Sequence, residues 1–314
     1  MNTYNIFIDG EHGTTGLQIR ERLRKHPNIN IVSIDHDKRR DPDSKRRIMS
    51  RVDVTILCLP DDAARDAAVL AEDAGCRVLD ASSAHRTADD WVFGMPELCS
   101  GQRAAIRDAR KVSNPGCYST GAILLLRPLV DARLLAATVP YPITAISGYT
   151  GGGNKLIEKY EGTSTPPSHA TYGLDFCHKH IQEIKKWSNL EALPFFLPSV
   201  GDFRQGMLVF IQIAHAAEQG GRSFHEALRR HYEDESLVQI QPYNEIDPVT
   251  APFITPHGME GTDQALLSVF GSAEANKSLL VAKLDNLGKG ASGAAVQNLN
   301  VMLGLNERTA TSLV

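Results

Sequence analysis

A cysteine that directly follows a Pro-Gly turn is the strongest candidate nucleophile in this sequence. Cys117 comes after residues 113–116, Ser-Asn-Pro-Gly, and opens an apolar segment, residues 117–135, whose spacing predicts a helix. The positive end of a helix stabilises thiolate over thiol and so lowers the pKa of the sulfur. Backbone N–H groups at the same helix start could also hold an oxyanion formed when this sulfur attacks a carbonyl. Cys58 and Cys76 fit the ordinary role of small buried residues, and the remaining two cysteines have no activating context.

Two histidines offer the acid/base group that a thiolate nucleophile needs. His178 and His180 stand just before an amphipathic segment, residues 181–187. In an extended stretch both imidazoles would face one side, whereas on a helix they would diverge, so we expect one of them to act with Cys117. The H-x-H spacing also occurs in metal sites, but no carboxylate or cysteine spacing supports one here, and we predict no metal.

Three glycines with the spacing G-x-x-G-x-x-G separate a predicted strand from a predicted helix. Gly10, Gly13 and Gly16 would let backbone N–H groups approach a pyrophosphate at the positive end of that helix. A plain tight turn is the alternative, but the strand before it and the helix after it favour a dinucleotide site. The hydroxyls of Thr14 and Thr15 could add contacts to phosphate.

A cluster of charged residues at the end of the second predicted strand bears on the choice of dinucleotide. Asp35 stands where an acidic residue would bind a ribose 2′-hydroxyl, but Lys38, Arg39 and Arg40 follow it and could hold a 2′-phosphate instead. We therefore favour NADP over NAD, with Arg39 as a cofactor contact. A solvated charge run in a surface loop is an equal alternative, because residues 45–47 extend the same run.

Two arginines are candidates for binding an anionic group of a substrate. Arg86 ends the segment 81–86, which follows the fourth predicted strand at the carboxyl edge of the sheet, where ligands of open α/β folds collect. Arg86 could clamp a phosphate or carboxylate, with a structural salt bridge as the alternative, and Ser82 in the same segment is assigned to the cofactor. Arg204 is the second candidate, since the neighbouring Gly206 allows a ligand to approach closely.

These candidates need a scaffold, and the first part of the chain predicts a Rossmann-type parallel sheet. Strands and helices alternate there, which implies a doubly wound α/β fold. The expected strands are residues 4–8, 29–34, 52–59 and 77–80, and the expected helices are residues 14–25 and 62–74.

The pattern changes after about residue 113 and predicts a second, α+β domain with a mixed sheet. Apolar runs at residues 143–146 and 207–214 read as strands. Residues 147–168 contain many turn-forming residues, and we interpret part of this stretch as a site loop. Residues 288–305 have few charges and many small side chains, so a helix here could pack closely on a sheet or a cofactor.

Composition narrows the classes of function. The chain has 314 residues with 42% hydrophobic and 22% charged residues and a formal net charge of −4, which suits a globular protein of two domains. The negative net charge provides no broad basic surface for binding nucleic acid. No apolar stretch reaches the length of a membrane span. Five cysteines without a paired framework indicate reduced thiols and a cytoplasmic protein. The expected partner is a small-molecule substrate.

The motifs taken together resemble the N-acetyl-gamma-glutamyl-phosphate reductases, in particular their shorter form, which belong to one superfamily with the aspartate-semialdehyde dehydrogenases. The segments that carry the resemblance are residues 10–16, 81–86, 113–117, 147–153, 178–184 and 285–293. The segments Ser-Asn-Pro-Gly-Cys-Tyr and Asp-Asn-Leu-Gly-Lys-Gly-Ala are specific, while many dehydrogenases share the glycine turn. One departure is Gln182, which stands where the family usually has proline before Glu183.

The resemblance implies roles for residues on both predicted domains. Cys117 would form an acyl-enzyme, His180 would be the acid/base group, and His178 would support it. The implied contacts to the nicotinamide end of the cofactor are Asn286, Gly288, Lys289 and Gly290. The implied substrate contacts, besides Arg86 and Arg204, are Asn114, Ser147 and Gly148.

The resemblance also implies a domain division and an assembly. Residues 1–116 would form the NADP-binding domain, completed by the C-terminal helix within residues 286–314. Residues 117–285 would form the catalytic and oligomerisation domain. Family members usually form homodimers or homotetramers.

The implied reaction is reduction of N-acetyl-L-glutamyl 5-phosphate by NADPH to N-acetyl-L-glutamate 5-semialdehyde and phosphate, a step toward arginine. Cys117 would attack the acyl phosphate and leave a thioester that accepts hydride. One alternative is a sister oxidoreductase, such as an aspartate-semialdehyde dehydrogenase, with the same catalytic roles and another acyl pocket. The other is a non-catalytic NADP-binding sensor.

Overall fold

The computed structural model describes residues 3–162, 165–215, 220–272 and 274–313. It divides the chain into two compact units. The first unit contains the chain up to Pro96, Ser100–Pro115 and Ala291–Ser312, and the second contains Glu97–Cys99 and Gly116–Gly290. The chain therefore returns to the first unit at its C-terminal end.

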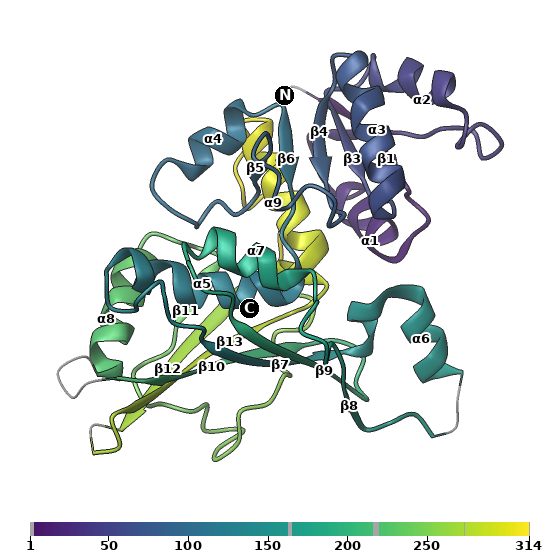
Figure 1. The fold of residues 1–314 in the computed structure, drawn as a ribbon. Helices are drawn as coiled ribbons and strands as arrows, with labels where there is room; N and C mark the ends of the chain where they lie inside the picture. The colour runs from purple at the N-terminus through teal and green to yellow at the C-terminus, as the bar shows by residue number, and fades with distance from the viewer. Residues whose placement is uncertain (1–2, 163–164, 216–219, 273, 314) are drawn as a thin grey trace. The chain divides into compact units, whose positions relative to one another are not determined.

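The first unit is built on a six-stranded sheet whose strands pair in parallel, in the order β2-β1-β3-β4-β6-β5 (Figure 1). The strands are β1 (Tyr4–Asp9), β2 (Ile29–Val32), β3 (Val54–Leu57), β4 (Arg77–Asp80), β5 (Val92–Phe93) and β6 (Lys111–Ser113). The central strands are buried along their length, as expected for a parallel sheet with helices on its faces. This confirms the Rossmann-type fold predicted for this part of the chain.

Helices from both ends of the chain cover this sheet. They are α1 (Thr14–Leu23), α2 (Pro42–Met49), α3 (Asp61–Asp73), α4 (Gln102–Asp108) and α9 (Gly293–Met302). Ile6 and Ile56 of the sheet share one buried cluster with Ile19 of α1 and with Val296 and Leu299 of α9. The C-terminal helix is thus part of the core of the first unit.

A buried histidine ties the two ends of the chain together in that core. His26, just after α1, has its Nε2 2.9 Å from Oδ1 of Asn300 on α9. Its Nδ1 accepts a hydrogen bond from the Asn28 amide at 3.1 Å, so Nε2 carries the proton and donates to Asn300. Burial lowers the pKa of His26, and the bond to Asn300 opposes this shift.

The second unit is built on a seven-stranded mixed sheet in the order β11-β12-β13-β10-β7-β9-β8. Its strands are β7 (Pro142–Gly148), β8 (His169–Thr171), β9 (Phe195–Gly201), β10 (Met207–Ala214), β11 (Val238–Ile240), β12 (Ala265–Ser272) and β13 (Lys277–Leu284). β10 pairs antiparallel with β13 and β7, whereas β7 pairs parallel with β9. The predicted mixed sheet is confirmed.

Helices α5 (Cys117–Asp131), α7 (His180–Trp187) and α8 (Gly221–His231) lie on one face of this sheet (Figure 1). α5 packs on β10 and β13 and contacts α7 and α8. α5 is buried along most of its length, which is why its sequence is apolar on all sides. The helix that begins with Cys117 is therefore held from several directions.

Three predicted segments differ from the structure. Residues 45–47 lie in α2 instead of a loop, because Asp41 caps that helix by accepting from the Ser44 amide. The predicted site loop at 147–168 contains a 3₁₀ turn (Tyr149–Gly152) and α6 (Gly153–Glu161), and residues 163 and 164 of it lie outside the described residues. The predicted helix at 288–305 begins with a π-helical turn (Gly288–Ser292) before α9.

Candidate active site

Cys117 is the first residue of α5, as the sequence predicts, and the loop before it is fixed by a buried carboxylate. Gly116 is the N-cap of α5 in an extended conformation. Its amide donates to Oε1 of Glu183 at 2.8 Å, and the hydroxyls of Ser119 and Thr120 donate to its carbonyl. The backbone at the start of α5 is therefore held on both its N–H and its C=O sides.

Glu183 is not among the predicted site residues. It lies on α7 three residues after His180 and is 1% exposed. Because its partner Gly116 is 67 residues away in the chain, no local pattern reveals this contact. The sequence signal is its spacing of about one helical turn from His180, which places Glu183 on the same face of α7 as that histidine.

The structure brings both predicted histidines to Tyr118, the residue that follows the candidate nucleophile Cys117. The ring centroids of His178 and His180 are 4.7 Å apart, and they lie 6.5 Å and 5.8 Å from the ring of Tyr118. His180 begins α7 and is buried, and its amide donates to Nδ1 of His178 at 3.2 Å. Two imidazoles, a thiol and the start of a helix therefore share one region of the second unit, which is the set of groups that covalent acyl transfer requires.

The segment that closes the second unit packs against Cys117. A methyl group added to Gly290 would lie 2.9 Å from Cβ of Cys117, so glycine is needed for this approach. Gly288, at the start of the same turn, lies against the carbonyl of Thr262. Asn286 accepts from the Gly206 amide at 3.0 Å and donates to the Thr150 hydroxyl at 2.9 Å.

Lys289, which the resemblance assigned to the cofactor, forms a buried ion pair with Glu97. Its Nζ lies 2.6 Å from Oε1 of Glu97, and both side chains are almost completely buried. A buried charge needs such a partner, and this contact gives the ammonium group a structural role.

The predicted substrate residues on this unit have different surroundings. Ser147 and Gly148 end β7 and line a cavity of about 510 Å³ together with Tyr118. Arg204 does not line that cavity, and its guanidinium is exposed and pairs with Glu161 at the end of α6.

The glycine turn in the first unit has the shape of a phosphate cradle. Gly10 has φ +91°, and a methyl group on it would lie 2.3 Å from the Cys58 carbonyl oxygen. A methyl group on Gly16 would lie 2.3 Å from the Gly10 carbonyl oxygen, so this glycine lets α1 approach the turn. α1 begins directly after the turn and has no acidic residue in its first turn, so its positive end is not neutralised from within the helix.

A cavity of about 490 Å³ lies against this turn and is bordered by basic side chains. Gly10 and Gly13 line it, whereas Thr14 and Thr15 do not. Arg39, Arg40 and Lys45 are among the other residues at its walls, together with His12 and His36. The turn, the helix start and these cations fit the phosphates of a dinucleotide.

The acidic residue at the end of β2 lies outside this cavity. Asp35 is exposed and pairs with Lys38 at 2.8 Å. Lys45 of α2 lies 2.7 Å from Asp9 at the end of β1, and burial raises the pKa of Asp9 while Lys45 opposes the shift. The cavity wall therefore carries the carboxylates of Asp9 and Glu11 as well as the basic side chains, whereas Asp35 does not line it.

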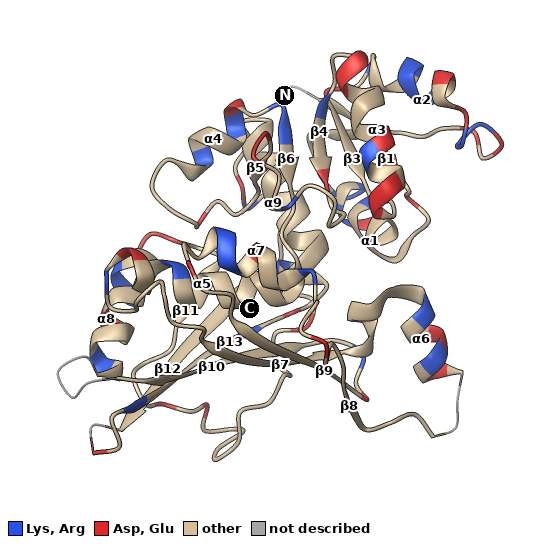
Figure 2. Ribbon diagram, viewed as in Figure 1, with Lys and Arg blue, Asp and Glu red and all other residues tan. Residues whose placement is uncertain are grey.

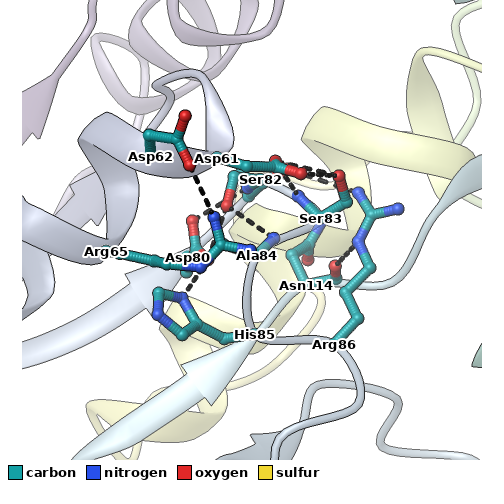
Figure 3. Close-up of polar contacts among 11 residues, drawn as sticks. Asp61, Asp62, Arg65, Asp80, Ser82, Ser83, Ala84, His85, Arg86 and Asn114 are labelled. Atoms are coloured by element: carbon teal, nitrogen blue, oxygen red, sulfur yellow. Dashed lines mark hydrogen bonds and ion pairs between the residues drawn. The ribbon is translucent and has the colours of Figure 1, made fainter. Parts of the chain in front are cut away.

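The segment after β4 forms a hydrogen-bonded loop at the carboxyl edge of the sheet (Figure 3). Buried Asp80 accepts from the amide and hydroxyl of Ser82 and lies 2.7 Å from Nδ1 of His85. Nε of Arg86 donates to the Asn114 carbonyl at 3.0 Å. The Asn114 amide group donates to the Ala291 carbonyl and accepts from Asn298. These contacts give Ser82, Arg86 and Asn114 structural partners within the first unit.

Two further expectations concern absences. Among the residues that the structure describes, no group of three or more His, Cys, Asp and Glu side chains could hold a metal ion. Of the helices in the described part of the chain, none is long and apolar enough to cross a membrane.

Comparison with known proteins gives this fold and site a class. Residues 35–109 match the family model described as "Semialdehyde dehydrogenase, NAD binding domain", and residues 117–286 match "Semialdehyde dehydrogenase, dimerisation domain". The structure of aspartate semialdehyde dehydrogenase II from Vibrio cholerae superposes with a TM-score of 0.70 over 96% of this chain and 99% of that one, at 17% identity. A second neighbour, aspartate semialdehyde dehydrogenase from Francisella tularensis, has a TM-score of 0.70 at 13% identity, over 96% of this chain and 100% of that one. The fold is that of the semialdehyde dehydrogenases.

The curated relatives define the branch within this class. N-acetyl-gamma-glutamyl-phosphate reductase 2 from Nostoc sp. is 47% identical over 98% of this chain and 99% of its own length. N-acetyl-gamma-glutamyl-phosphate reductase from Brucella ovis is 46% identical over 95% of this chain and 98% of its own length. The chain belongs to the N-acetyl-gamma-glutamyl-phosphate reductase family. It is an oxidoreductase that uses a nicotinamide dinucleotide.

Proposed function

We propose that this enzyme reduces N-acetyl-L-glutamyl 5-phosphate with NADPH to N-acetyl-L-glutamate 5-semialdehyde and phosphate, a step in arginine biosynthesis. The observation that carries the proposal is the position of Cys117 at the start of α5, with the His178 and His180 rings around the adjacent Tyr118. The identity to curated N-acetyl-gamma-glutamyl-phosphate reductases over nearly the whole chain supports this choice of substrate.

Each residue of the cluster has a defined part in the proposed chemistry. The Cys117 thiolate attacks the acyl carbon, the C–O bond to phosphate breaks, and a thioester to Cys117 remains. Amide groups at the start of α5 stabilise the oxyanion that forms on this carbon. Reduction of the thioester leaves a hemithioacetal oxyanion on Cys117, which His180 protonates. As the C–S bond breaks, His180 takes this proton back, the aldehyde forms and the Cys117 thiolate is restored. His178 holds His180 in place by accepting from its amide, and Glu183 holds the loop at Gly116.

We propose NADP rather than NAD as the dinucleotide. When bound, it supplies the hydride. The turn at Gly10, Gly13 and Gly16 would hold its pyrophosphate, and Arg39 and Arg40 would hold a 2′-phosphate. Asp35, the residue that would favour NAD, does not line the cavity and is paired with Lys38.

The substrate is tested by a side-by-side assay. The purified enzyme is given NADP and phosphate with either N-acetyl-L-glutamate 5-semialdehyde or aspartate 4-semialdehyde. We expect a kcat/KM at least about 100-fold higher with the N-acetylated substrate, since a site built for one polar group discriminates strongly against its absence. A preference for aspartate 4-semialdehyde would contradict the proposed substrate and favour the alternative, an aspartate-semialdehyde dehydrogenase.

The non-catalytic alternative predicts a different thiol chemistry. An NADP-binding sensor has no need of a reactive cysteine, so iodoacetamide would then label Cys117 no faster than the other exposed or half-buried cysteines. We expect Cys117 to be labelled first.

We also propose that the enzyme is a cytoplasmic homodimer or homotetramer. The five cysteines, all within the described part of the chain, do not form disulfides, which fits a reducing compartment. The match of the second unit to a family model described as a dimerisation domain supports self-association. Light scattering would give the mass of the assembly, and a monomer at micromolar concentration would contradict this part of the proposal.

A further inference from the structure

The cavity of about 510 Å³ in the second unit, which we call the α6 cavity, has one wall formed by helix α6. Ser147, Gly148 and Tyr118 form its floor, and Tyr172, after β8, closes another side. Pro167, Ala170 and Val200 give it an apolar surface as well. The cavity therefore offers both apolar surface and polar groups to a small molecule.

Two lysines of α6 face this cavity. Lys155 and Lys159 both line it, as residues four apart on one helix face can do. The acidic residues of the same helix, Glu158 and Glu161, do not line it, and Glu161 instead binds Arg204 and the Tyr149 hydroxyl. The blue and red segments of α6 in Figure 2 show this alternation of charge along the helix. Among the described residues at its walls there is no carboxylate, so the cavity is electropositive.

The position of α6 is fixed by aromatic packing. Tyr160 is buried and stacks on Tyr149, with ring centroids 5.0 Å apart and an angle of 15° between the planes. Leu156 packs over Gly152, where an added methyl group would lie 2.4 Å from its side chain. The helix is thus anchored to the end of β7, and its lysines are held over the cavity.

The cavity adjoins the nucleophile. Tyr118, on its floor, is the residue after Cys117 in α5. Tyr172 lies within electrostatic range of Cys117, since a charge on Cys117 adds to the effect of burial that raises the pKa of Tyr172 to about 12. Tyr172 also packs against His178, with ring centroids 5.8 Å apart. Cys117 and the two histidines do not line the cavity themselves. Tyr118 and Tyr172, which do, contact these histidines, so a molecule in the α6 cavity would lie near the candidate nucleophile.

We propose that the α6 cavity binds the end of the acyl substrate away from the reacting carbon, with Lys155 and Lys159 holding its carboxylate. This inference rests on the proposed function, because the N-acetylglutamyl chain carries a carboxylate four bonds from the acyl carbon. The two arginines expected to bind such a group are otherwise engaged, Arg204 with Glu161 and Arg86 with the Asn114 carbonyl. The lysines are specificity-determining residues, since they bind a part of the substrate that does not react.

An anion in this cavity could come from the carboxylate or from the phosphate that Cys117 displaces. The reverse reaction separates these sources, because semialdehyde and inorganic phosphate are then added as different molecules. Lys155→Met, Lys159→Met and the double variant are assayed with each substrate varied in turn. Lys25→Met, which removes an exposed lysine of the first unit, is the matched control for the loss of charge.

We expect the double variant to raise the KM for the semialdehyde about 30-fold, each lysine contributing about fivefold, as for charge-assisted hydrogen bonds near a protein surface. The KM for phosphate and the kcat should change less than about twofold, and the control should behave like the unchanged enzyme. An unchanged KM for the semialdehyde overturns the proposal, and a rise in the KM for phosphate alone assigns the lysines to phosphate and overturns it too.

A second measurement does not depend on turnover. N-acetyl-L-glutamate should slow iodoacetamide labelling of Cys117, followed by mass spectrometry, and its neutral diamide should not. The double variant should lose this protection while keeping the labelling rate without ligand. If neither semialdehyde is a substrate, the proposed function fails. Protection of Cys117 by N-acetyl-L-glutamate would still test whether the α6 cavity binds the carboxylate. Equal protection in both proteins, or none in either, overturns the proposal.

Discussion

At the scale of single residues, Cys117 differs from Cys58 and Cys76 in its backbone surroundings. Burial raises the pKa of both Cys58 and Cys76 thiols, which keeps them protonated. Cys117 is half-buried, as Cys58 is, but it begins a helix, and the positive end of a helix favours the thiolate. Its position at the start of a helix is therefore what favours Cys117 as the proposed nucleophile.

Cys117→Ser should lower turnover by about 10⁴-fold or more, the scale seen when a covalent nucleophile is removed. A serine hydroxyl stays protonated near pH 7 and cannot replace the thiolate. NADP affinity, measured by fluorescence titration, should be unchanged because the cavity at the glycine turn is lined by residues of the first unit. Turnover within tenfold of the unchanged enzyme would remove Cys117 from the mechanism.

We expect Glu183 to act through its hydrogen bond to Gly116, in the loop that precedes Cys117. Glu183→Ala removes the acceptor of the buried Gly116 amide, which should cost about 2 kcal/mol in the free energy of unfolding. We expect kcat to fall with little change in KM, and the rate of Cys117 alkylation to fall in parallel. Glu183→Gln retains an acceptor oxygen and should restore most of both. If Cys117 is alkylated as fast in Glu183→Ala as in the unchanged enzyme, Glu183 has only a structural role.

At the scale of elements, the sequence predicted the segments with strong local patterns. β1, β3, β4 and α5 were predicted because each contains several buried apolar residues that stand close together in the sequence. α2 was missed because only Met49 of its eight residues is buried, so its formation depends on the Asp41 cap and not on an apolar face. β12 and β13 were not predicted either, although each supports the other along its full length.

The residues of the candidate site also fall into two groups, those that a local sequence pattern reveals and those that it does not. Cys117, the histidines and the glycine turn are visible in local spacing, and the structure gives each a surrounding that suits its predicted role. Glu183 and the lysines of the α6 cavity were missed because their significance depends on contacts between segments far apart in the chain. Local patterns reveal groups that carry chemistry, whereas positioning groups emerge only from tertiary contacts.

The glycine turn gives a prediction that separates folding from cofactor binding. A methyl group on Gly13 would lie 3.5 Å from its nearest neighbour, the Gly10 carbonyl oxygen, so the folded chain can accept it. A bound pyrophosphate would meet that methyl group. Gly13→Ala should therefore keep its Tm within about 2 °C and weaken NADP binding at least about tenfold. Gly16→Ala, which clashes with backbone, should lower the Tm as well.

If Gly13→Ala binds NADP as tightly as the unchanged protein, the phosphates do not lie at this turn. Thermal melts and calorimetric titration of the two alanine variants in parallel provide both readouts.

At the scale of the whole molecule, the first unit is completed by the end of the chain. α9 joins the buried cluster of the parallel sheet, and His26 bonds to Asn300 across 274 residues of sequence. A chain that stopped before α9 would leave that cluster open. This unit therefore reaches its full stability only when the C-terminal helix is in place.

The His26 contact makes this stability depend on pH. The folded-state pKa of His26 lies below its ordinary value of 6.5, so the unfolded chain binds the proton more readily. The free energy of unfolding should be highest above that value and fall as the pH drops below about 6.5. In His26→Gln the profile should be flatter between pH 7.5 and about 5.5, while exposed His169→Gln should follow the unchanged protein.

Urea unfolding of a Trp187→Phe background reports this unit, because Trp91 then remains as the fluorophore of the first unit. Parallel pH profiles for the unchanged protein and His26→Gln would show that the buried imidazole is not the titrating group.

The most direct test of the account is to look for the acyl group on sulfur. The enzyme is mixed with N-acetyl-L-glutamyl 5-phosphate in the absence of dinucleotide, quenched in acid, digested and analysed by mass spectrometry, while released phosphate is counted. We predict a burst of about one phosphate per active site and an N-acetylglutamyl thioester on Cys117, with none in Cys117→Ser. Turnover with NADPH but no acyl group on Cys117, or an acyl group on another residue, would contradict the central claim.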